Sequence, residues 1–161
     1  MAPPKRIRTF RDLLVWQKAF ELCLEVYRVT DVFPRHERYG LAADLRKTVR
    51  SIPYNIAEGH RRTSTLEYVR FLDMASGSAA ELETQFLLGR ALGYTDENLS
   101  LRLLAALSEV ERMLAALMRK LREKTASPAV GSSRPSLDPS NPWLLTPRQR
   151  TLCFETGASR A

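Results

Sequence analysis

Cysteine and histidine are scarce in this sequence, with two of each among 161 residues. Cys23 lies in an apolar helical pattern and Cys153 lies far away in a low-complexity tail, so neither a disulfide framework nor a zinc site is indicated. A di-iron helical bundle needs Glu-x-x-His pairs, but phenylalanine and alanine stand three residues before His36 and His60. We therefore expect no metal and no cofactor.

Long apolar runs and glycine-rich loops are also missing. No stretch approaches the roughly 18 apolar residues that a membrane span requires, and no apolar signal core follows the basic residues near the start. The seven glycines form no Walker or dinucleotide-binding pattern, and neither Cys23 nor Ser51 has the sequence signature of a nucleophile. These absences predict a cytoplasmic protein that is not an enzyme.

One pair of carboxylates keeps an enzymatic alternative open. Glu58 and Glu81 fall on two predicted helices that we expect to be neighbours, and paired carboxylates can act in acid–base catalysis. Arg62 follows Glu58 by one helical turn, however, so an ion pair explains Glu58 equally well. We favour the ion pair.

The chain is basic. Its 25 Lys and Arg residues outnumber 18 Asp and Glu residues, and the formal net charge of +7 favours a polyanionic partner such as nucleic acid. Residues 1–124 hold 21 of the basic and 16 of the acidic residues, a net charge of +5. Composition divides the chain into a basic arm at 1–11, a helical domain at 12–124 and a Pro/Ser-rich tail at 125–161, which we expect to be disordered.

Apolar residues recur every three or four positions in four segments, which is the period of an amphipathic α-helix. We predict helices at 12–30, 37–61, 64–92 and 95–124. Because such helices must bury their apolar faces together, the predicted fold is all-α, an up-down-up-down antiparallel four-helix bundle. The predicted buried seams, in chain order, are Leu13, Trp16, Phe20, Cys23 or Leu24 and Tyr27; Leu41, Leu45, Thr48 or Val49, Ile52 and Ile56; Tyr68, Leu72, Ala75, Ala79, Leu82 and Phe86; and Leu103, Leu107, Val110, Leu114, Leu117 and Leu121.

The stretch SIPYNIAEGHRR, residues 51–62, interrupts the second helix with polar and helix-breaking residues. Pro53 removes one backbone donor, which predicts a kink rather than a stop because the apolar spacing resumes at Ile56. Either Ser51 or Asn55 is expected to bond the carbonyl of Val49, directly or through water, because Pro53 leaves that carbonyl without its usual partner.

Small residues at 75–80 in the third helix should allow the kinked part of the second helix to come close, since small side chains let two backbones approach. Gly59 is expected to serve the same approach. The residues that we assign to this structural and interface motif are Ser51, Pro53, Asn55, Glu58, Gly59, Gly77 and Glu81.

Basic residues supply the candidate nucleic-acid site. Arg46, Arg50 and Arg61 share one direction on the second helix. The arm adds Arg8 and Arg11, together with Lys5 and Arg6. Cations arranged along a helix neutralise phosphates without reading sequence, so we predict non-specific binding to RNA or DNA. The alternative is a structural or protein-interaction module in which Ser51, Asn55 and Glu58 fix the register between subunits.

Four motifs carry a resemblance that covers most of residues 10–92. They are LVWQKA at 14–19, FP..E.YGL at 33–41, SIP.NIAEG at 51–59 and GSA.ELE at 77–83. The chain resembles the bacterial four-helix bundle proteins encoded in intervening sequences of 23S ribosomal RNA genes. That family is similar to the accessory variability proteins of diversity-generating retroelements, which form pentameric rings and bind nucleic acid and a reverse transcriptase. The resemblance implies a homo-oligomer, a pentamer, and adds a reverse transcriptase as a candidate partner.

Overall fold

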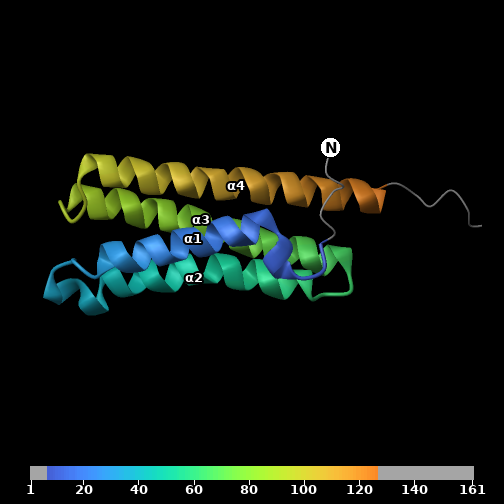
Figure 1. Ribbon diagram of the computed structural model, residues 1–161, viewed down its shortest axis with the longest axis horizontal. Helices are drawn as coiled ribbons and strands as arrows, with labels where there is room; N and C mark the ends of the chain where they lie inside the picture. Colours follow the sequence, from blue (N-terminus) through green and yellow to red (C-terminus); the bar gives the residue numbers. More distant parts are fainter. Residues whose placement is uncertain (1–6, 127–161) are drawn as a thin grey trace, which may run out of the picture. The chain divides into compact units, whose positions relative to one another are not determined.

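The computed structural model describes residues 7–126, which form four α-helices and two short 3-10 turns, with no β-strand in that range (Figure 1). The helices are α1 (Leu14–Thr30), α2 (Leu41–His60), α3 (Thr65–Ala91) and α4 (Glu97–Ala126). This confirms the all-α prediction. Residues 125 and 126, expected to belong to the tail, continue α4, and the rest of the tail lies outside the described residues. None of these four helices is long and apolar enough to cross a membrane.

Each helix packs against two others around one apolar core. α1 and α3 both contact α2 and α4, and Figure 1 shows the α1–α2 and α3–α4 connections at one end and the α2–α3 connection at the other. The predicted seams of α2, α3 and α4 are confirmed in their central turns, where Ile52, Leu72 and Val110 are completely buried. The ends of two seams are only half-buried, at Tyr68, Leu117 and Leu121.

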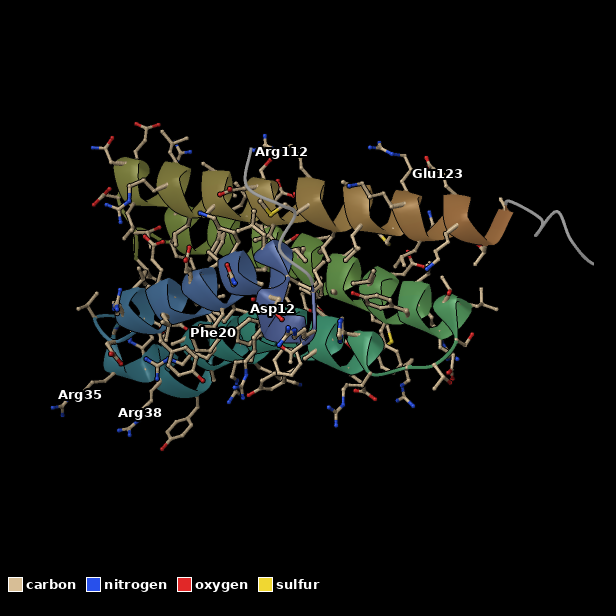
Figure 2. The ribbon with its side chains drawn as sticks, turned by 45° about the vertical axis from the view of Figure 1, so that its right-hand side comes forward. Asp12, Phe20, Arg35, Arg38, Arg112 and Glu123 are labelled. Atoms are coloured by element: carbon tan, nitrogen blue, oxygen red, sulfur yellow. The ribbon has the colours of Figure 1, made fainter. Side chains whose placement is uncertain are left out.

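The buried face of α1 differs from the prediction. Leu13 and Cys23 are buried as expected, but the rest of the core face consists of the neighbouring stripe Val15, Ala19, Leu22 and Val26. Phe20 and Leu24 are each 44% exposed, and Trp16 and Tyr27 are half-buried. Figure 2 shows Phe20 on α1 beside the α2 ribbon. α1 therefore carries two adjacent apolar stripes, of which only one faces the core.

Two helices begin later than their apolar pattern predicts, because a short 3-10 turn precedes each of them. At Phe10–Asp12, the Asp12 carboxylate accepts the backbone N–H groups of Arg8 and Thr9 at 3.0 Å. At Arg35–Tyr39, the Glu37 carboxylate accepts the first N–H of α2, from Leu41, at 2.8 Å. That bond and a second one from the Tyr94 hydroxyl lower the pKa of Glu37.

The connection between α3 and α4 is a complete C-terminal capping motif. Gly93 adopts φ of 75°, where a side chain would be strained, and its N–H donates to the carbonyl of Arg90 at 3.0 Å. The N–H of Tyr94 donates to the carbonyl of Gly89 at 2.9 Å, which completes the Schellman pattern. Asp96 then caps α4 by accepting the N–H of Leu99 at 2.8 Å. Gly93 therefore ends α3.

Side-chain hydrogen bonds join α2 to α3 along a polar seam. Ser51 Oγ and Ser78 Oγ are 2.7 Å apart, so α2 meets the small-residue run as predicted. Asn55 donates to the Ser51 carbonyl at 2.9 Å and to Ser51 Oγ at 3.0 Å. Neither Ser51 nor Asn55 bonds the Val49 carbonyl directly, because both side chains make these other contacts, and a bond through water stays a prediction. α2 runs through Pro53 to His60, and the kink there stays a prediction.

Two glycines of the predicted motif have opposite surroundings. A Cβ atom on Gly59 would lie 2.8 Å from Phe71 Cβ and 2.8 Å from Tyr68 Cδ2, so this glycine permits the close approach of α2 and α3. The same approach buries the Tyr68 hydroxyl and raises the pKa of Tyr68 to about 12. A Cβ on Gly77 would meet no atom within 4 Å, so its predicted packing role is wrong. Gly77 lies on the exposed side of α3, one position away from the stripe that faces α2.

These surroundings predict opposite effects for the same substitution. Gly59→Ala should lower the free energy of unfolding by about 1–3 kcal/mol, because neither the Phe71 Cβ nor the Tyr68 ring can move away cheaply. Gly77→Ala should raise it by about 0.5–1 kcal/mol, because alanine restricts the unfolded chain and favours helix. Urea unfolding of both variants checks the pair. Equal shifts in the two midpoints would contradict the assignment of the close approach to Gly59.

Candidate functional site

The two carboxylates considered for catalysis have separate partners. Glu58 pairs with Arg62, whose guanidinium also lies over the Phe71 ring at 4.7 Å. Glu81 Oε1 accepts from Thr48 Oγ1 at 3.1 Å and from Gln85 Nε2 at 3.3 Å. The ion pair that we favoured for Glu58 is therefore present, and Glu81 belongs to the polar seam between α2 and α3.

His36, His60 and Cys23 make contacts typical of structural residues. Within residues 7–126 no three His, Cys, Asp or Glu side chains come together as a set of metal ligands. His36 Nε2 lies 3.4 Å from the Tyr94 hydroxyl, and the His60 ring meets the Tyr68 ring edge-on. Cys23 is buried, and that burial raises the pKa of its thiol. Cys153 lies outside the described residues.

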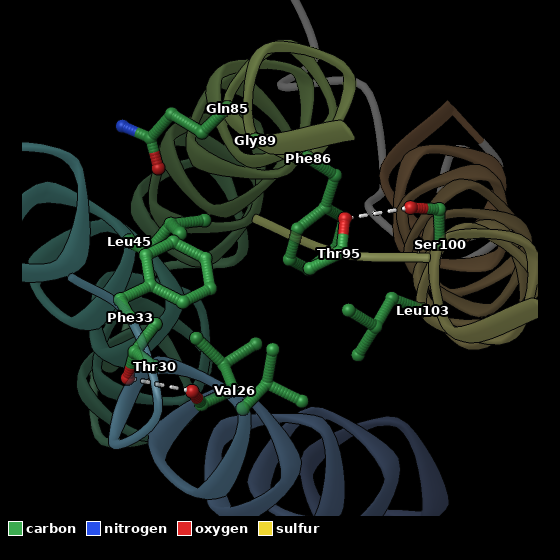
Figure 3. Close-up of a pocket in the computed structure, with 11 residues that line it drawn as sticks. Val26, Thr30, Phe33, Leu45, Gln85, Phe86, Gly89, Thr95, Ser100 and Leu103 are labelled. Carbon is green, nitrogen blue, oxygen red and sulfur yellow. Dashed lines mark hydrogen bonds between the residues drawn. The ribbon is translucent and has the colours of Figure 1, made fainter. Parts of the chain in front are cut away.

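Among the described residues, a small cavity lies at the end of the bundle where the loop between α1 and α2 is found (Figure 3). Its volume is about 10 Å³, and Val26, Phe33, Phe86 and Leu103 form most of its apolar wall. Ser100 on this wall is buried and hydrogen-bonds Thr95 at 2.8 Å. A space of this size is comparable to a single water molecule and far smaller than a metabolite.

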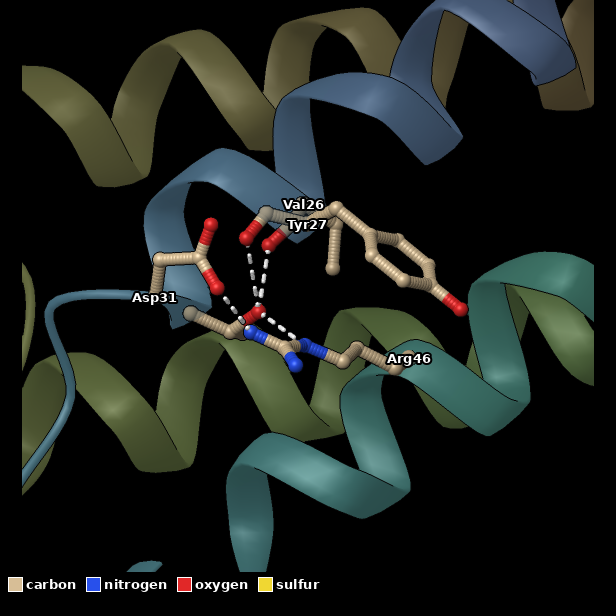
Figure 4. Close-up of polar contacts among 5 residues, drawn as sticks. Val26, Tyr27, Asp31 and Arg46 are labelled. Carbon is tan, nitrogen blue, oxygen red and sulfur yellow. Dashed lines mark hydrogen bonds and ion pairs between the residues drawn. The ribbon is translucent and has the colours of Figure 1, made fainter. Parts of the chain in front are cut away.

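Arg46 has an internal role that the sequence did not reveal. Its Nε donates to Thr30 Oγ1 at 2.7 Å, and its Nη2 pairs with Asp31 at 2.7 Å (Figure 4). Its guanidinium also lies over the Tyr27 ring, 5.1 Å from the centroid. Thr30 in turn donates to carbonyl oxygens of α1, so Arg46 holds the end of α1 against α2. Only part of its charge is available to a ligand.

The other four predicted arginines are exposed. Arg50 lies on α2, Arg61 is the residue that caps the C-terminus of α2, and Arg8 and Arg11 lie just before α1. In the part of the chain that the structure describes, none of the four forms an ion pair with a carboxylate. We call these four residues, Arg8, Arg11, Arg50 and Arg61, the basic face. Lys5 and Arg6 lie outside the described residues.

A groove of about 370 Å³ joins the two segments that carry the basic face. Arg50 lines it from α2, and Phe10, on whose ring Arg11 packs at 5.7 Å, lines it from the start of the chain. We call this space the aromatic groove. Its walls are Phe10, Trp16, Phe20, Cys23, Leu24, Tyr27, Arg50, Pro53, Tyr54 and Ala57. α1 supplies five of these residues, and the sequence analysis missed the groove because it placed all five in the core.

A second, more polar pocket of about 260 Å³ lies at the α1–α2 connection. Arg35, Arg38 and Arg46 contribute to its lining, with Asp31 opposite Arg46. Arg35 and Arg38 extend away from the helices in Figure 2. Sequence reasoning did not include these two residues in the candidate site, although both lie in the basic FPRHER stretch before α2.

Comparison with known proteins identifies a family and a similar solved structure. A family model described as 23S rRNA-intervening sequence protein matches residues 11–116. A crystal structure from Bacteroides thetaiotaomicron, described as a protein with unknown function from the S23 ribosomal protein family, superposes with a TM-score of 0.62 at 17% sequence identity. The similarity covers 66% of this chain and 96% of that one, and it shows a shared fold. No match was found among curated proteins.

Proposed function

The chain belongs to the 23S rRNA-intervening sequence protein family, and from this premise we propose that it is a non-enzymatic, oligomeric adaptor of the cytoplasm that binds nucleic acid without reading sequence. Phosphates of RNA or DNA are the groups that the basic face would neutralise. Guanidinium groups suit this role because they remain charged and can bond two phosphate oxygens at once.

The proposal rests on one observation: Arg11 and Arg50, from two segments distant in sequence, lie at the same groove. Arg11 packs on Phe10, and Phe10 and Arg50 line the same groove. Arg61 lies one helical turn beyond Ala57, which lines that groove as well. A phosphate backbone lying along α2 could therefore contact several guanidiniums together.

The salt dependence of binding tests this proposal. If four arginines neutralise four phosphates, the slope of log affinity against log salt should be about −3.6, so affinity for duplex DNA should fall about 100-fold between about 50 and 200 mM salt. Fluorescence anisotropy with a labelled duplex measures the slope. Absence of binding at the lowest salt would refute the nucleic-acid function and leave a structural or protein-interaction module.

Self-association is the second part of the proposal, and we expect a ring-shaped pentamer. Exposed leucines on α3 and α4, namely Leu87, Leu88 and Leu101, supply apolar surface that association would bury. Ser51 and Asn55 use their hydrogen-bonding groups within the chain. This favours an apolar contact between subunits over polar residues that fix the subunit register. Light scattering should give five times the 18.3 kDa chain mass. A single-chain mass at high concentration would refute the oligomer.

A reverse transcriptase is a candidate protein partner on the basis of the resemblance alone. A reverse-transcriptase gene beside the gene for this chain would support that role, and co-purification of the two products would test it. A failure to co-purify would leave the nucleic-acid proposal unaffected.

A further inference from the structure

The aromatic groove presents flat rings to solvent. Phe20 is 44% exposed and Tyr54 is 65% exposed, although both are large apolar side chains. The Trp16 and Phe20 rings are stacked, with centroids 5.2 Å apart and an interplanar angle of 14°. Phe10 meets Trp16 edge-on at 5.1 Å, which holds the Trp16 ring in place. The Trp16 and Phe20 rings are therefore oriented by their neighbours before any ligand arrives.

Positive charge surrounds these rings. The lining of the groove includes one guanidinium, that of Arg50, and no carboxylate. Arg50 Nε donates to the Arg46 carbonyl at 2.9 Å, which fixes the side chain along α2 and leaves its terminal nitrogens unused by that bond. Arg11 packs on the Phe10 ring at the other wall. A second copy of this basic chain would bring like charges together here, whereas a polyanion with apolar faces complements the groove.

We propose that the aromatic groove binds unstacked bases of single-stranded nucleic acid, with Tyr54 and Phe20 stacking on the bases while Arg50 and Arg11 contact the adjoining phosphates. This inference rests on the proposed function and narrows its substrate class from nucleic acid in general to single strands. In a duplex the base faces are covered by their neighbours, so a duplex can use the arginines but not the rings. Base stacking on aromatic side chains tolerates any sequence, because every base has a flat face.

The test compares three labelled probes of equal length at one salt concentration: a single-stranded RNA, a duplex of the same sequence and an abasic sugar–phosphate strand. The single strand should bind more tightly than the abasic strand. Tyr54→Ala and Phe20→Ala should each weaken single-strand binding by about 5- to 100-fold, as expected for the loss of a stacked base. Both variants should leave duplex and abasic affinities unchanged. Met74→Ala, which removes a side chain of similar exposure outside the groove, should change none of the three.

A second readout requires no change in the groove. Trp16 lines the groove, and Trp143 is the other of two tryptophans in the chain. With Trp143 replaced by phenylalanine, Trp16 fluorescence should be quenched by the single strand and unchanged by the abasic strand.

The outcomes separate the two proposals. Equal affinity for single and abasic strands, with no quenching of Trp16, would overturn the base-binding role while leaving the basic face intact. Failure of all three probes to bind would overturn the proposed function and this inference together. A change of assembled mass in Tyr54→Ala, with single-strand affinity unaltered, would assign the groove to contact between copies and overturn the base-binding role.

Discussion

Replacing Arg8, Arg11, Arg50 and Arg61 together with glutamine is expected to reduce affinity for RNA and DNA by tenfold or more at low salt. Each lost phosphate contact should also make the salt slope shallower by about 1, so the slope of the variant should approach zero. Glutamine keeps most of the side-chain length but removes the charge. The four residues are exposed and form no ion pair among the described residues, so the helical fold should not depend on their charge.

A matched control separates local contacts from net charge. Arg28, Arg70, Arg112 and Arg119 are also exposed, and their replacement by glutamine changes the formal charge by the same amount. The control variant should keep nearly the full salt slope. If both variants lose affinity equally, attraction by the whole charged chain explains binding and the basic face has no special part. Arg46 is left out of the set because its removal would also release Thr30 and Asp31.

Leu72→Ala is expected to have the largest effect on stability. Leu72 is completely buried in the core, and removing three side-chain carbons there loses transfer free energy and leaves a cavity. The free energy of unfolding should fall by about 2–5 kcal/mol, a large part of the total for a domain of this size. Circular dichroism at 222 nm during urea unfolding measures the change.

Leu66→Ala on the same helix provides the control for this prediction. Leu66 is 79% exposed, so the same chemical change should alter the free energy of unfolding by less than about 0.5 kcal/mol. A loss below about 1 kcal/mol in Leu72→Ala would contradict the tight packing of α3 into the core.

The sequence alone was sufficient to predict the fold class and most of the core. In α2 and α4 one apolar stripe competes with charged residues on the other faces, so the 3.6-residue period identifies the buried side. In α1 two apolar stripes stand next to each other with the same spacing. The period cannot decide between Val15 and Trp16, or between Ala19 and Phe20, since that choice depends on how much room the three other helices leave. In the structure the smaller side chains, Val15 and Ala19, are buried, and the aromatic side chains of Trp16 and Phe20 lie nearer the surface.

The candidate site was predictable in part. Exposed arginines on α2 followed from their shared direction on one helix, but the partners of Arg46 come from the end of α1, and no local pattern predicts that contact. Gly77 illustrates the same limit, because composition marks a run of small residues without saying which of them faces the neighbouring helix. Phe10 and Arg50 line the same groove although about 40 positions of sequence separate them. Helical periodicity does not predict such a contact, because it depends on tertiary packing.

Natural selection acts differently on the two apolar stripes of α1, because one stripe is buried in the core and the other lies at the surface. A mutation in the buried stripe acts mainly on the stability of the fold. The residues of that stripe are Val15, Ala19, Leu22 and Val26. At Phe20 and Leu24, which are each 44% exposed, a mutation changes the surface of the groove more than the packing of the core. Related chains that adopt a different ligand would therefore diverge at the second set of positions while retaining the first.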